Sequence, residues 1–325
     1  MKAVNVTAYG SPEVLQLQEV PMPEPGPGQV RIRVAATSVN FADIQARRGT
    51  YRSPRQPPFI PGLEMAGTVD ALGPGAIGFE IGQRVAAHAD SGSYAEYALA
   101  RTVGVFALPD EIDWDGAAIF PSVGTTAFNL LTMAGRLQPG ESVLIHAAAG
   151  GVGSTAVQLA RVLGAGFIIG TVGSADKAKV ARDLGADATI NYQQEDIVER
   201  VRALTGGEGV DVVLDGVGAS TFEASVSSLA PYGRVVAYGQ ASGAPPPVAF
   251  GPIYGDNKSV IGYSSGGNRR LRPEIMRPPG IAVMKLLTRG RWKPLIGARF
   301  PLAQAAEAHR LIEDRESIGK VLLTV

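Results

Sequence analysis

A glycine-rich turn between an apolar segment and an amphipathic segment limits most strongly what this chain can fold into. The segment ESVLIHAAA (141–149) is predicted to form a strand buried on both faces, and GGVGSTAVQLARVLG (150–164) a helix that ends at its last glycine. Strand, glycine turn and helix in this order match a dinucleotide-binding fingerprint, with Ala148 in the first glycine position. Gly150 and Gly153 hold the second and third positions. The sequence therefore predicts a nucleotide-binding α/β fold.

The fingerprint glycines have separate physical tasks. The second lets the backbone approach a pyrophosphate, and the third lets the helix pack closely on the strand. N–H groups at the helix N-terminus bind phosphate oxygens. A fingerprint alone is weak support, because a glycine-rich core turn has the same appearance, but here a second apolar strand, GFIIGTVG (166–173), follows the helix. We therefore expect a pyrophosphate to bind at four residues: Gly150, Gly151, Val152 and Gly153.

Apolar strands alternate with helices over residues 121–261. Strands are expected at 141–149, 166–173, 188–192, 210–218, 233–239 and 258–265, and helices at 150–164, 174–185 and 195–206. Continuous apolar strands are buried on both faces, so the alternation predicts a doubly wound parallel sheet. The segment between the last two strands, 239–252, is expected to be an uncharged loop.

Residues 1–120 are rich in short strands instead. Strands are expected at 29–39, 64–72, 83–88 and 94–100, separated by turns that use many of the 41 Gly and 23 Pro of this 325-residue chain. Such a pattern predicts a compact, partly open barrel. Residues 262–325 hold a predicted helix (303–316), a predicted strand (320–325) and a basic stretch at 268–280 that is expected to be irregular. This tail is too short to be a domain, so we expect domains at 1–120 with 262–325 and, inserted, 121–261.

The end of the second strand of the α/β region indicates which dinucleotide is bound. NAD sites usually place Asp or Glu there, where the carboxylate binds the ribose 2′-hydroxyl and repels a 2′-phosphate. Here the sequence is GTVGSADK (170–177), with no acid before Asp176. Ser174, Lys177 and Tyr192 supply donors and a positive charge, so NADPH is favoured over NADH. Alternatively, Ser174 is only a helix N-cap and Lys177 only a solvated side chain.

Composition excludes several function classes. The chain has no Cys, which excludes disulfides, thiolate catalysis, iron–sulfur clusters and thiolate-bound zinc. The 30 Lys and Arg balance the 30 Asp and Glu, so binding to polyanions is not expected. Residues 116–135 carry no charge, but polar residues and a proline interrupt them, which favours a buried helix over a membrane span. The N-terminus lacks an apolar signal region, and a cytoplasmic protein is expected.

Several motifs together resemble a known family. LIHAAAGGVG, GTVGSADKAK, INY, VDVVLDGVG and the early NFADI, GTY and PGLEMAG segments resemble the zinc-independent, zeta-crystallin-like quinone oxidoreductases. These belong to the medium-chain dehydrogenase/reductase superfamily. The resemblance covers nearly the whole chain and keeps the motifs in order. It implies a GroES-like β-rich catalytic domain, a Rossmann domain that binds NADPH, and a homodimer.

The resemblance also implies site residues. Nicotinamide and active-site contacts fall on Asn40, Tyr51 and Thr126, and the loop that passes the nicotinamide falls on Tyr238, Gly239 and Gln240. Contacts to the 2′-phosphate fall on Gly173, Ser174, Lys177, Tyr192 and Arg315. Tyr263 and Phe250 are further candidates for lining the pocket.

A metal is not expected. Zinc alcohol dehydrogenases of the same superfamily carry a Gly-His-Glu-type segment, which here is Gly62-Leu63-Glu64 and lacks the imidazole. Glu64 alone cannot hold zinc in a tetrahedral site. His88 and His309 are far apart in sequence, and His146 is expected to pack or to form hydrogen bonds beside the glycine turn.

Without a metal, the cofactor supplies hydride, and the protein orients it and manages protons. The resemblance implies hydride transfer from NADPH to a quinone or a similar α,β-unsaturated carbonyl compound. An enoyl-thioester reductase is one alternative, since that branch places a tyrosine proton donor in a stretch matched here by Asn40, Asp43, Gly49 and Tyr51. An NADPH-binding crystallin or RNA-binding protein is the other, with the arginines of 268–277 as its candidate patch.

Overall fold

The computed structural model describes residues 1–51, 55–244 and 248–325. It divides into two compact units, one made of residues 1–125 and 268–325 and the other of residues 126–267. Both ends of the chain therefore belong to the first unit, and the second unit is inserted. The boundaries lie a few residues later than 120 and 261, because the helix α3 (Thr125–Asn129) crosses the first of them and packs mostly as part of the second unit.

The second unit contains a six-stranded parallel sheet. Its strands are β8 (Ser142–Ile145), β9 (Phe167–Val172), β10 (Ala188–Asn191), β11 (Val210–Asp215), β12 (Leu229–Ala237) and β13 (Ser259–Gly262). Their spatial order is β10-β9-β8-β11-β12-β13, so the winding direction reverses between β8 and β11. That order defines a doubly wound sheet, and ligands of such sheets bind outside the carboxyl ends of the strands at the reversal.

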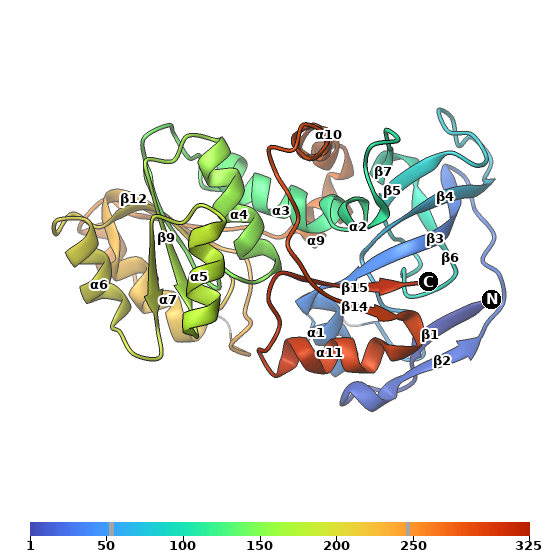
Figure 1. Ribbon diagram of the computed structural model, residues 1–325, viewed down its shortest axis with the longest axis horizontal. Helices are drawn as coiled ribbons and strands as arrows, with labels where there is room; N and C mark the ends of the chain where they lie inside the picture. The colour runs from blue at the N-terminus through green and yellow to red at the C-terminus, as the bar shows by residue number, and fades with distance from the viewer. Residues whose placement is uncertain (52–54, 245–247) are drawn as a thin grey trace. The chain divides into compact units, whose positions relative to one another are not determined.

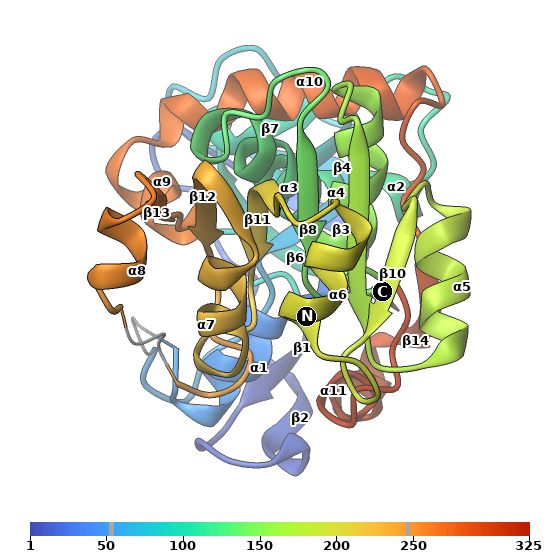
Figure 2. The same cartoon turned by 90° about the vertical axis from the view of Figure 1, so that its left-hand side faces the viewer.

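Helices connect these strands and cover the sheet (Figure 2). They are α4 (Gly151–Val162), α5 (Ala175–Asp183), α6 (Ile197–Leu204), α7 (Ala219–Ser227) and the short α8 (Gly251–Tyr254). Buried side chains from the strands, including Leu144, Ile169 and Val213, pack with Phe222 of α7 in one hydrophobic core. The prediction of a doubly wound α/β unit is therefore confirmed. The structure adds α8, which begins at the last two residues of the segment 239–252 that was expected to be a loop and extends beyond it.

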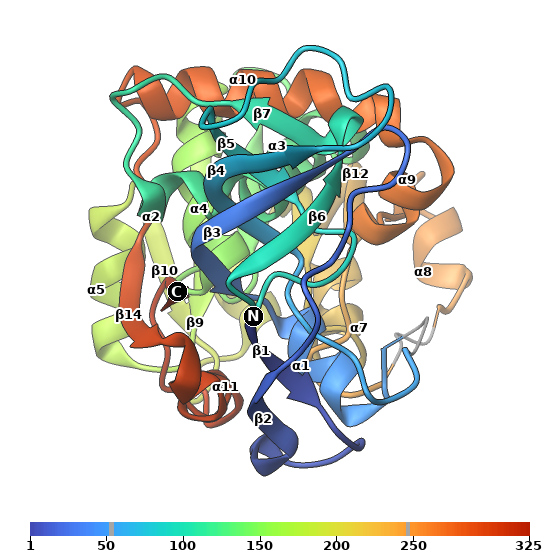
Figure 3. The same cartoon turned by 90° about the vertical axis from the view of Figure 1, so that its right-hand side faces the viewer.

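The first unit is built on a seven-stranded sheet (Figure 3). Its strands are β3 (Gln29–Val39), β4 (Glu64–Leu72), β5 (Arg84–His88), β6 (Tyr97–Arg101), β7 (Val105–Ala107), β14 (Ile296–Pro301) and β15 (Lys320–Thr324), and β1 (Lys2–Val6) pairs separately with β2 (Leu15–Glu19). The order is β14-β15-β3-β4-β5-β7, with β6 also paired to β3. The C-terminal strand β15 lies antiparallel to β3, so the tail of the chain completes the sheet begun near its N-terminus.

The helices of the first unit correct one expectation. Residues 268–280 are not irregular, since α9 (Ser265–Leu271) leads through a short turn into α10 (Arg277–Thr288). Two prolines stand near the start of α10, where a missing N–H costs no helical hydrogen bond. The other helices are α1 (Phe41–Arg48), α2 (Trp114–Ala117) and α11 (Ala305–Glu313), which Figure 1 also shows.

The uncharged segment 116–135 is buried and helical, as expected. It consists of α2, α3 and two wider helical turns at 120–124 and 130–134. Within residues 1–51, 55–244 and 248–325, every helix is too short or too polar to cross a membrane.

Candidate functional site

The turn that follows β8 has the shape the fingerprint requires. Ala147 adopts a positive φ of 51°, and a Cβ atom at Gly153 would lie 2.1 Å from the Ala147 carbonyl oxygen. A side chain at 153 is therefore excluded by the backbone of the turn. Gly150 is the N-cap of α4, and no side chain caps this helix. The first-turn N–H groups of α4 thus remain available to an anion.

Because the strands are parallel, the segments after β9 and β10 lie at the same edge of the sheet as this turn. Gly173 and Ser174 follow β9, and Tyr192 follows β10. A Cβ atom at Gly173 would lie 2.6 Å from the Tyr192 hydroxyl oxygen, so the phenol rests against the glycine backbone. The structure brings these three predicted residues together.

Ser174 also caps α5, which was the alternative interpretation. Its hydroxyl oxygen accepts a hydrogen bond from the backbone N–H of Lys177 at 3.3 Å. A hydroxyl that accepts one bond keeps its proton for another acceptor. The capping role and a phosphate-binding role of Ser174 are therefore compatible. Lys177 lies half-buried in the first turn of the same helix.

The segment after β12 packs on the turn after β11. The N–H of Tyr238 donates to the Asp215 carbonyl at 2.9 Å, and a Cβ atom at Gly216 would lie 2.6 Å from the Tyr238 ring. The Asp215 carboxylate itself accepts from the N–H groups of Val217 and Gly218, which fixes the turn. These contacts fix the backbone of Tyr238, and Gly239 and Gln240 follow it at the carboxyl edge of the sheet. Thr126, in α3, is almost fully buried.

His146 has a structural role, as expected. Its Nδ1 lies 3.0 Å from the Thr171 hydroxyl and its Nε2 lies 3.0 Å from the Ser225 hydroxyl. Ser225 in turn donates to Asp215 at 2.7 Å. Burial lowers the pKa of His146 below its usual value, so the imidazole is neutral and joins β8 to its neighbours.

A buried polar cluster occupies the first unit. It consists of Glu64 at the start of β4, Lys320 at the start of β15, Ser38 in β3 and Asn40 before α1. The Glu64 carboxylate accepts from the Ser38 hydroxyl at 2.6 Å and from the N–H of Ser122 at 2.8 Å. The Lys320 ammonium lies 3.6 Å from that carboxylate and donates to the Val39 carbonyl at 2.7 Å. Four separate elements therefore meet at one buried ion pair.

This cluster fixes the side-chain amide of Asn40. Its Nδ2 donates to Glu64 at 3.2 Å, and its Oδ1 accepts from Lys320 at 2.9 Å. A carboxylate can only accept and an ammonium can only donate, so the amide has one orientation. Asn40 was predicted as a site residue, whereas Lys320 and Ser38 were not. A lysine that opens a terminal strand is ordinary in a sequence, and nothing in the pattern marked it.

Burial acts in opposite directions on the charges of the cluster. It raises the pKa of Glu64 and lowers that of Lys320, and the opposite charge of each partner counteracts the shift of the other. Burial also raises the pKa of Asp43 to about 6, although the N–H groups of Asn40 and Gly62 donate to this carboxylate. Asp43 is thus a structural hydrogen-bond partner of the backbone at Asn40 and Gly62.

Tyr51 follows α1 in the same unit. Gly49, at φ 74°, ends the helix, and the N–H of Tyr51 returns to the Gln45 carbonyl at 3.2 Å. The half-buried phenol acts electrostatically on Arg269, which belongs to α9. Arg269 donates from Nη1 to the Leu63 carbonyl at 3.4 Å and to His88 Nδ1 at 3.2 Å. Arg269 belongs to the basic stretch that was the candidate RNA-binding patch, and in the structure it is half-buried.

The remaining candidates are dispersed. Tyr263 is buried, and its hydroxyl accepts from Asn129 at 3.1 Å, whereas Phe250 is exposed and stacks on Tyr254. Arg277 of the basic stretch donates to the Val105 carbonyl at 3.1 Å. Arg315 follows α11 in the first unit, so its predicted contact with the 2′-phosphate stays a prediction.

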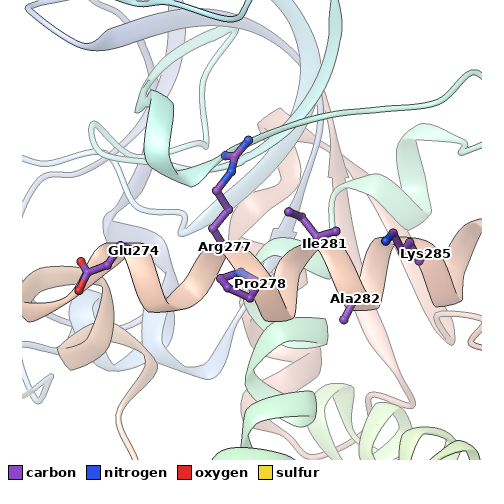
Figure 4. A pocket seen from close by; sticks show the side chains of 6 residues that line it. All are labelled: Glu274, Arg277, Pro278, Ile281, Ala282 and Lys285. Carbon is purple, nitrogen blue, oxygen red and sulfur yellow. The ribbon is translucent and has the colours of Figure 1, made fainter.

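A separate pocket of about 500 Å³ opens along α10 (Figure 4). Its walls are Glu274, Arg277, Pro278, Ile281, Ala282 and Lys285. None of the predicted cofactor or active-site residues lines it. In the described ranges, no three His, Asp or Glu side chains are grouped so that they could hold a metal ion.

Comparison with known proteins places both units. The family model for the alcohol dehydrogenase GroES-like domain matches residues 26–110, and the one for the zinc-binding dehydrogenase matches residues 151–277. A quinone oxidoreductase of Pseudomonas aeruginosa is 38% identical over 323 residues, 99% of each chain. A 2-haloacrylate reductase of a Burkholderia species is 36% identical, over 97% of this chain and 96% of its own.

Solved structures agree with these sequence matches. The crystal structure of an Escherichia coli quinone oxidoreductase complexed with NADPH superposes with a TM-score of 0.94 at 34% identity, covering all of both chains. A Pseudomonas syringae quinone oxidoreductase superposes with a TM-score of 0.93 at 36% identity. The two-domain fold class predicted from the sequence, GroES-like and Rossmann, is confirmed.

The buried ion pair predicts a stability effect. Replacing Lys320 by Met leaves the Glu64 carboxylate buried without its counter-charge, and breaking one side of such a pair typically costs about 3–5 kcal/mol. We expect the free energy of unfolding, measured with urea at pH 7, to fall by about that amount. The double variant Glu64→Gln/Lys320→Met removes both charges and should recover part of the loss. A Lys320→Met protein as stable as the wild type would contradict the assignment.

Proposed function

The chain belongs to the quinone oxidoreductase family of the medium-chain dehydrogenases and reductases, and from this we propose a function. The protein uses NADPH to reduce a quinone or a similar α,β-unsaturated carbonyl compound, and the reaction needs no metal ion. The observation that carries the proposal is the carboxyl edge of the parallel sheet. There the glycine turn after β8 and the donors after β9 and β10 lie together, and no carboxylate stands at the end of β9.

The residues at this edge fit NADPH. The first turn of α4 offers its backbone N–H groups to the pyrophosphate, those of Gly151, Val152 and Gly153. A Cβ atom at Gly153 would collide with the turn that forms this site. Ser174, Lys177 and Tyr192 offer hydroxyl and ammonium donors to a 2′-phosphate. We assign Gly173 and Arg315 to the same phosphate, and Thr126, Tyr238, Gly239 and Gln240 to the nicotinamide. Once bound, NADPH supplies the hydride.

The chain's own residues would orient the acceptor and manage protons. Asn40 presents an amide whose direction is fixed by Glu64 and Lys320. Its Nδ2 donates to Glu64 and to the Ser38 carbonyl, so the second acceptor site of Oδ1 is what it can offer to a donor group without reorganising. Tyr51 presents a half-buried phenol that can donate a proton. No thiolate exists in this chain, and Leu63 stands where the zinc dehydrogenases carry a ligand histidine, which supports a reaction without zinc. A homodimer and a cytoplasmic location stay predictions.

The test is oxidation of NADPH by the purified protein in the presence of a chelator, with 1,4-benzoquinone and crotonyl-CoA as acceptors. We expect turnover with the quinone, and turnover with NADPH to exceed that with NADH. Turnover of crotonyl-CoA alone would move the assignment to an enoyl-thioester reductase. Tight NADPH binding without oxidation by either acceptor would favour a binding protein.

Lys177 should decide the choice between the two cofactors. Replacing it by Ala removes a charge-assisted contact to the 2′-phosphate, so KM for NADPH should rise by about tenfold while KM for NADH stays near its wild-type value. The control is Lys179→Ala on the same helix, because Lys179 is exposed and pairs with Asp183 at 2.8 Å. Equal effects of Lys177→Ala on both cofactors would remove the assignment.

Tyr51 should matter most where carbon must be protonated. With Tyr51→Phe we expect kcat for an enone to fall on the order of 100-fold, a typical contribution of a general acid, and kcat for a quinone to fall much less. Tyr9→Phe is the matched control, since the Tyr9 hydroxyl donates to the Arg55 carbonyl in the same unit. Unchanged turnover of the enone would eliminate Tyr51 as the proton donor.

A further inference from the structure

Arg269 is a half-buried cation that forms no ion pair with any residue of the ranges 1–51, 55–244 and 248–325. Both of its hydrogen bonds leave from Nη1, and both go to neutral acceptors, the Leu63 carbonyl and His88 Nδ1. Because a guanidinium only donates, His88 must accept with Nδ1 and carry its proton on Nε2. Burial and the neighbouring Arg269 hold the pKa of His88 well below its usual value, so this imidazole cannot supply a negative charge. It does not neutralise Arg269.

Nearby carboxylates are already engaged elsewhere. Glu64 pairs with Lys320, and Asp43 accepts from the N–H groups of Asn40 and Gly62. The third, Asp90, pairs with Arg101 at 3.3 Å. None of the carboxylates in the described ranges forms an ion pair with Arg269 itself. The Nε and Nη2 atoms of Arg269 make no hydrogen bond to the described residues and are not buried, so this edge of the cation, beside a proposed active site, is open to an anionic ligand.

The geometry suits an anion with two oxygens. Since Nη1 makes both contacts, the edge formed by Nε and Nη2 is left for a ligand, and this edge matches the two oxygens of a carboxylate. Of the ionisable groups that act on Arg269, Tyr51 acts most strongly. Tyr51, the proposed proton donor, is therefore close enough to Arg269 in the first unit to raise the pKa of its guanidinium.

We propose that Arg269 binds the carboxylate of the substrate, and that the natural acceptors of this enzyme are α,β-unsaturated acids of the acrylate type. This inference rests on the proposed function and adds to it the substrate class and the residue that selects it. The hydrogen bonds to the Leu63 carbonyl and to His88 hold the Arg269 guanidinium in position. There it would stabilise negative charge that builds up on the substrate oxygens.

The reaction balances with the groups already named. Hydride adds to the β-carbon of the acid, and the carbon–carbon π pair moves toward the carboxylate as an enediolate. A proton from the Tyr51 hydroxyl, the donor proposed above, then adds to the α-carbon, which leaves the saturated acid and oxidised cofactor. The intermediate carries two negative charges on its oxygens, so it requires a cation more than the reduction of a quinone does. A relative that is 36% identical carries the name 2-haloacrylate reductase, which agrees with this substrate class.

The experiment compares 2-chloroacrylate with its methyl ester, which has the same double bond but no charge. We expect the wild type to reduce the acid, and Arg269→Gln to lower the acid-to-ester ratio of kcat/KM on the order of 10- to 100-fold. Arg269→Lys keeps the positive charge but loses the two parallel N–H donors. Its acid-to-ester ratio of kcat/KM should therefore lie between those of the wild type and Arg269→Gln. The matched control is Arg270→Gln, because Arg270 is the exposed neighbour on α9, and its ratio should equal that of the wild type.

A binding measurement without cofactor gives a second readout. The saturated acid 2-chloropropionate, titrated calorimetrically into the protein, should bind the wild type at least tenfold more tightly than it binds Arg269→Gln. Arg269→Lys, read in both assays, keeps the test decisive if the Gln variant does not fold. An unchanged ratio in Arg269→Gln, or a wild type that reduces benzoquinone but not 2-chloroacrylate, overturns the inference while the proposed function stands. Failure with quinone, ester and acid alike would overturn both.

Discussion

The ion pair between Glu64 and Lys320 is the interaction on which the first unit depends. Two opposite charges removed from water are stable only when each is also well hydrogen-bonded. Here the consecutive residues Ser38, Val39 and Asn40 supply bonds to the pair, and Ser122, from a distant segment, supplies another. The pair therefore requires β3, β4, β15 and the start of α1 to be placed correctly at once. One consequence is an asparagine amide with a single orientation.

In the second unit the corresponding constraint is steric. The carbonyl of Ala147 comes so close to residue 153 that only glycine fits, and this contact sets the angle at which α4 leaves β8. The parallel order of the strands then places the segments after β9, β10 and β12 beside the same turn. Binding of a dinucleotide fits this backbone geometry, and the proposed function assigns selection of the phosphate to the side chains after β9 and β10.

The two units use charge differently. At the carboxyl edge of the sheet, helix N–H groups, hydroxyls and Lys177 are arranged to meet a polyanion. In the polar cluster the charges of Glu64 and Lys320 are balanced within the protein, whereas Arg269 forms no ion pair with any of the described residues. This cation is half-buried but not neutralised by the protein. A negatively charged substrate can supply its counter-charge.

The sequence by itself determined the alternation of strands and helices, the glycine turn and the absence of thiolate chemistry, because these depend on residues close together in the chain. It also indicated the phosphate-binding residues, since parallel strands bring their carboxyl ends to one edge. It failed at 268–280, a basic stretch expected to be irregular, where two prolines stand in the first turn of a helix. Only the tertiary structure decided that Lys320 meets Glu64, more than 250 residues away in the chain, and that Arg269 meets Leu63. Contacts over such distances depend on how strands pair, and no local pattern records that pairing.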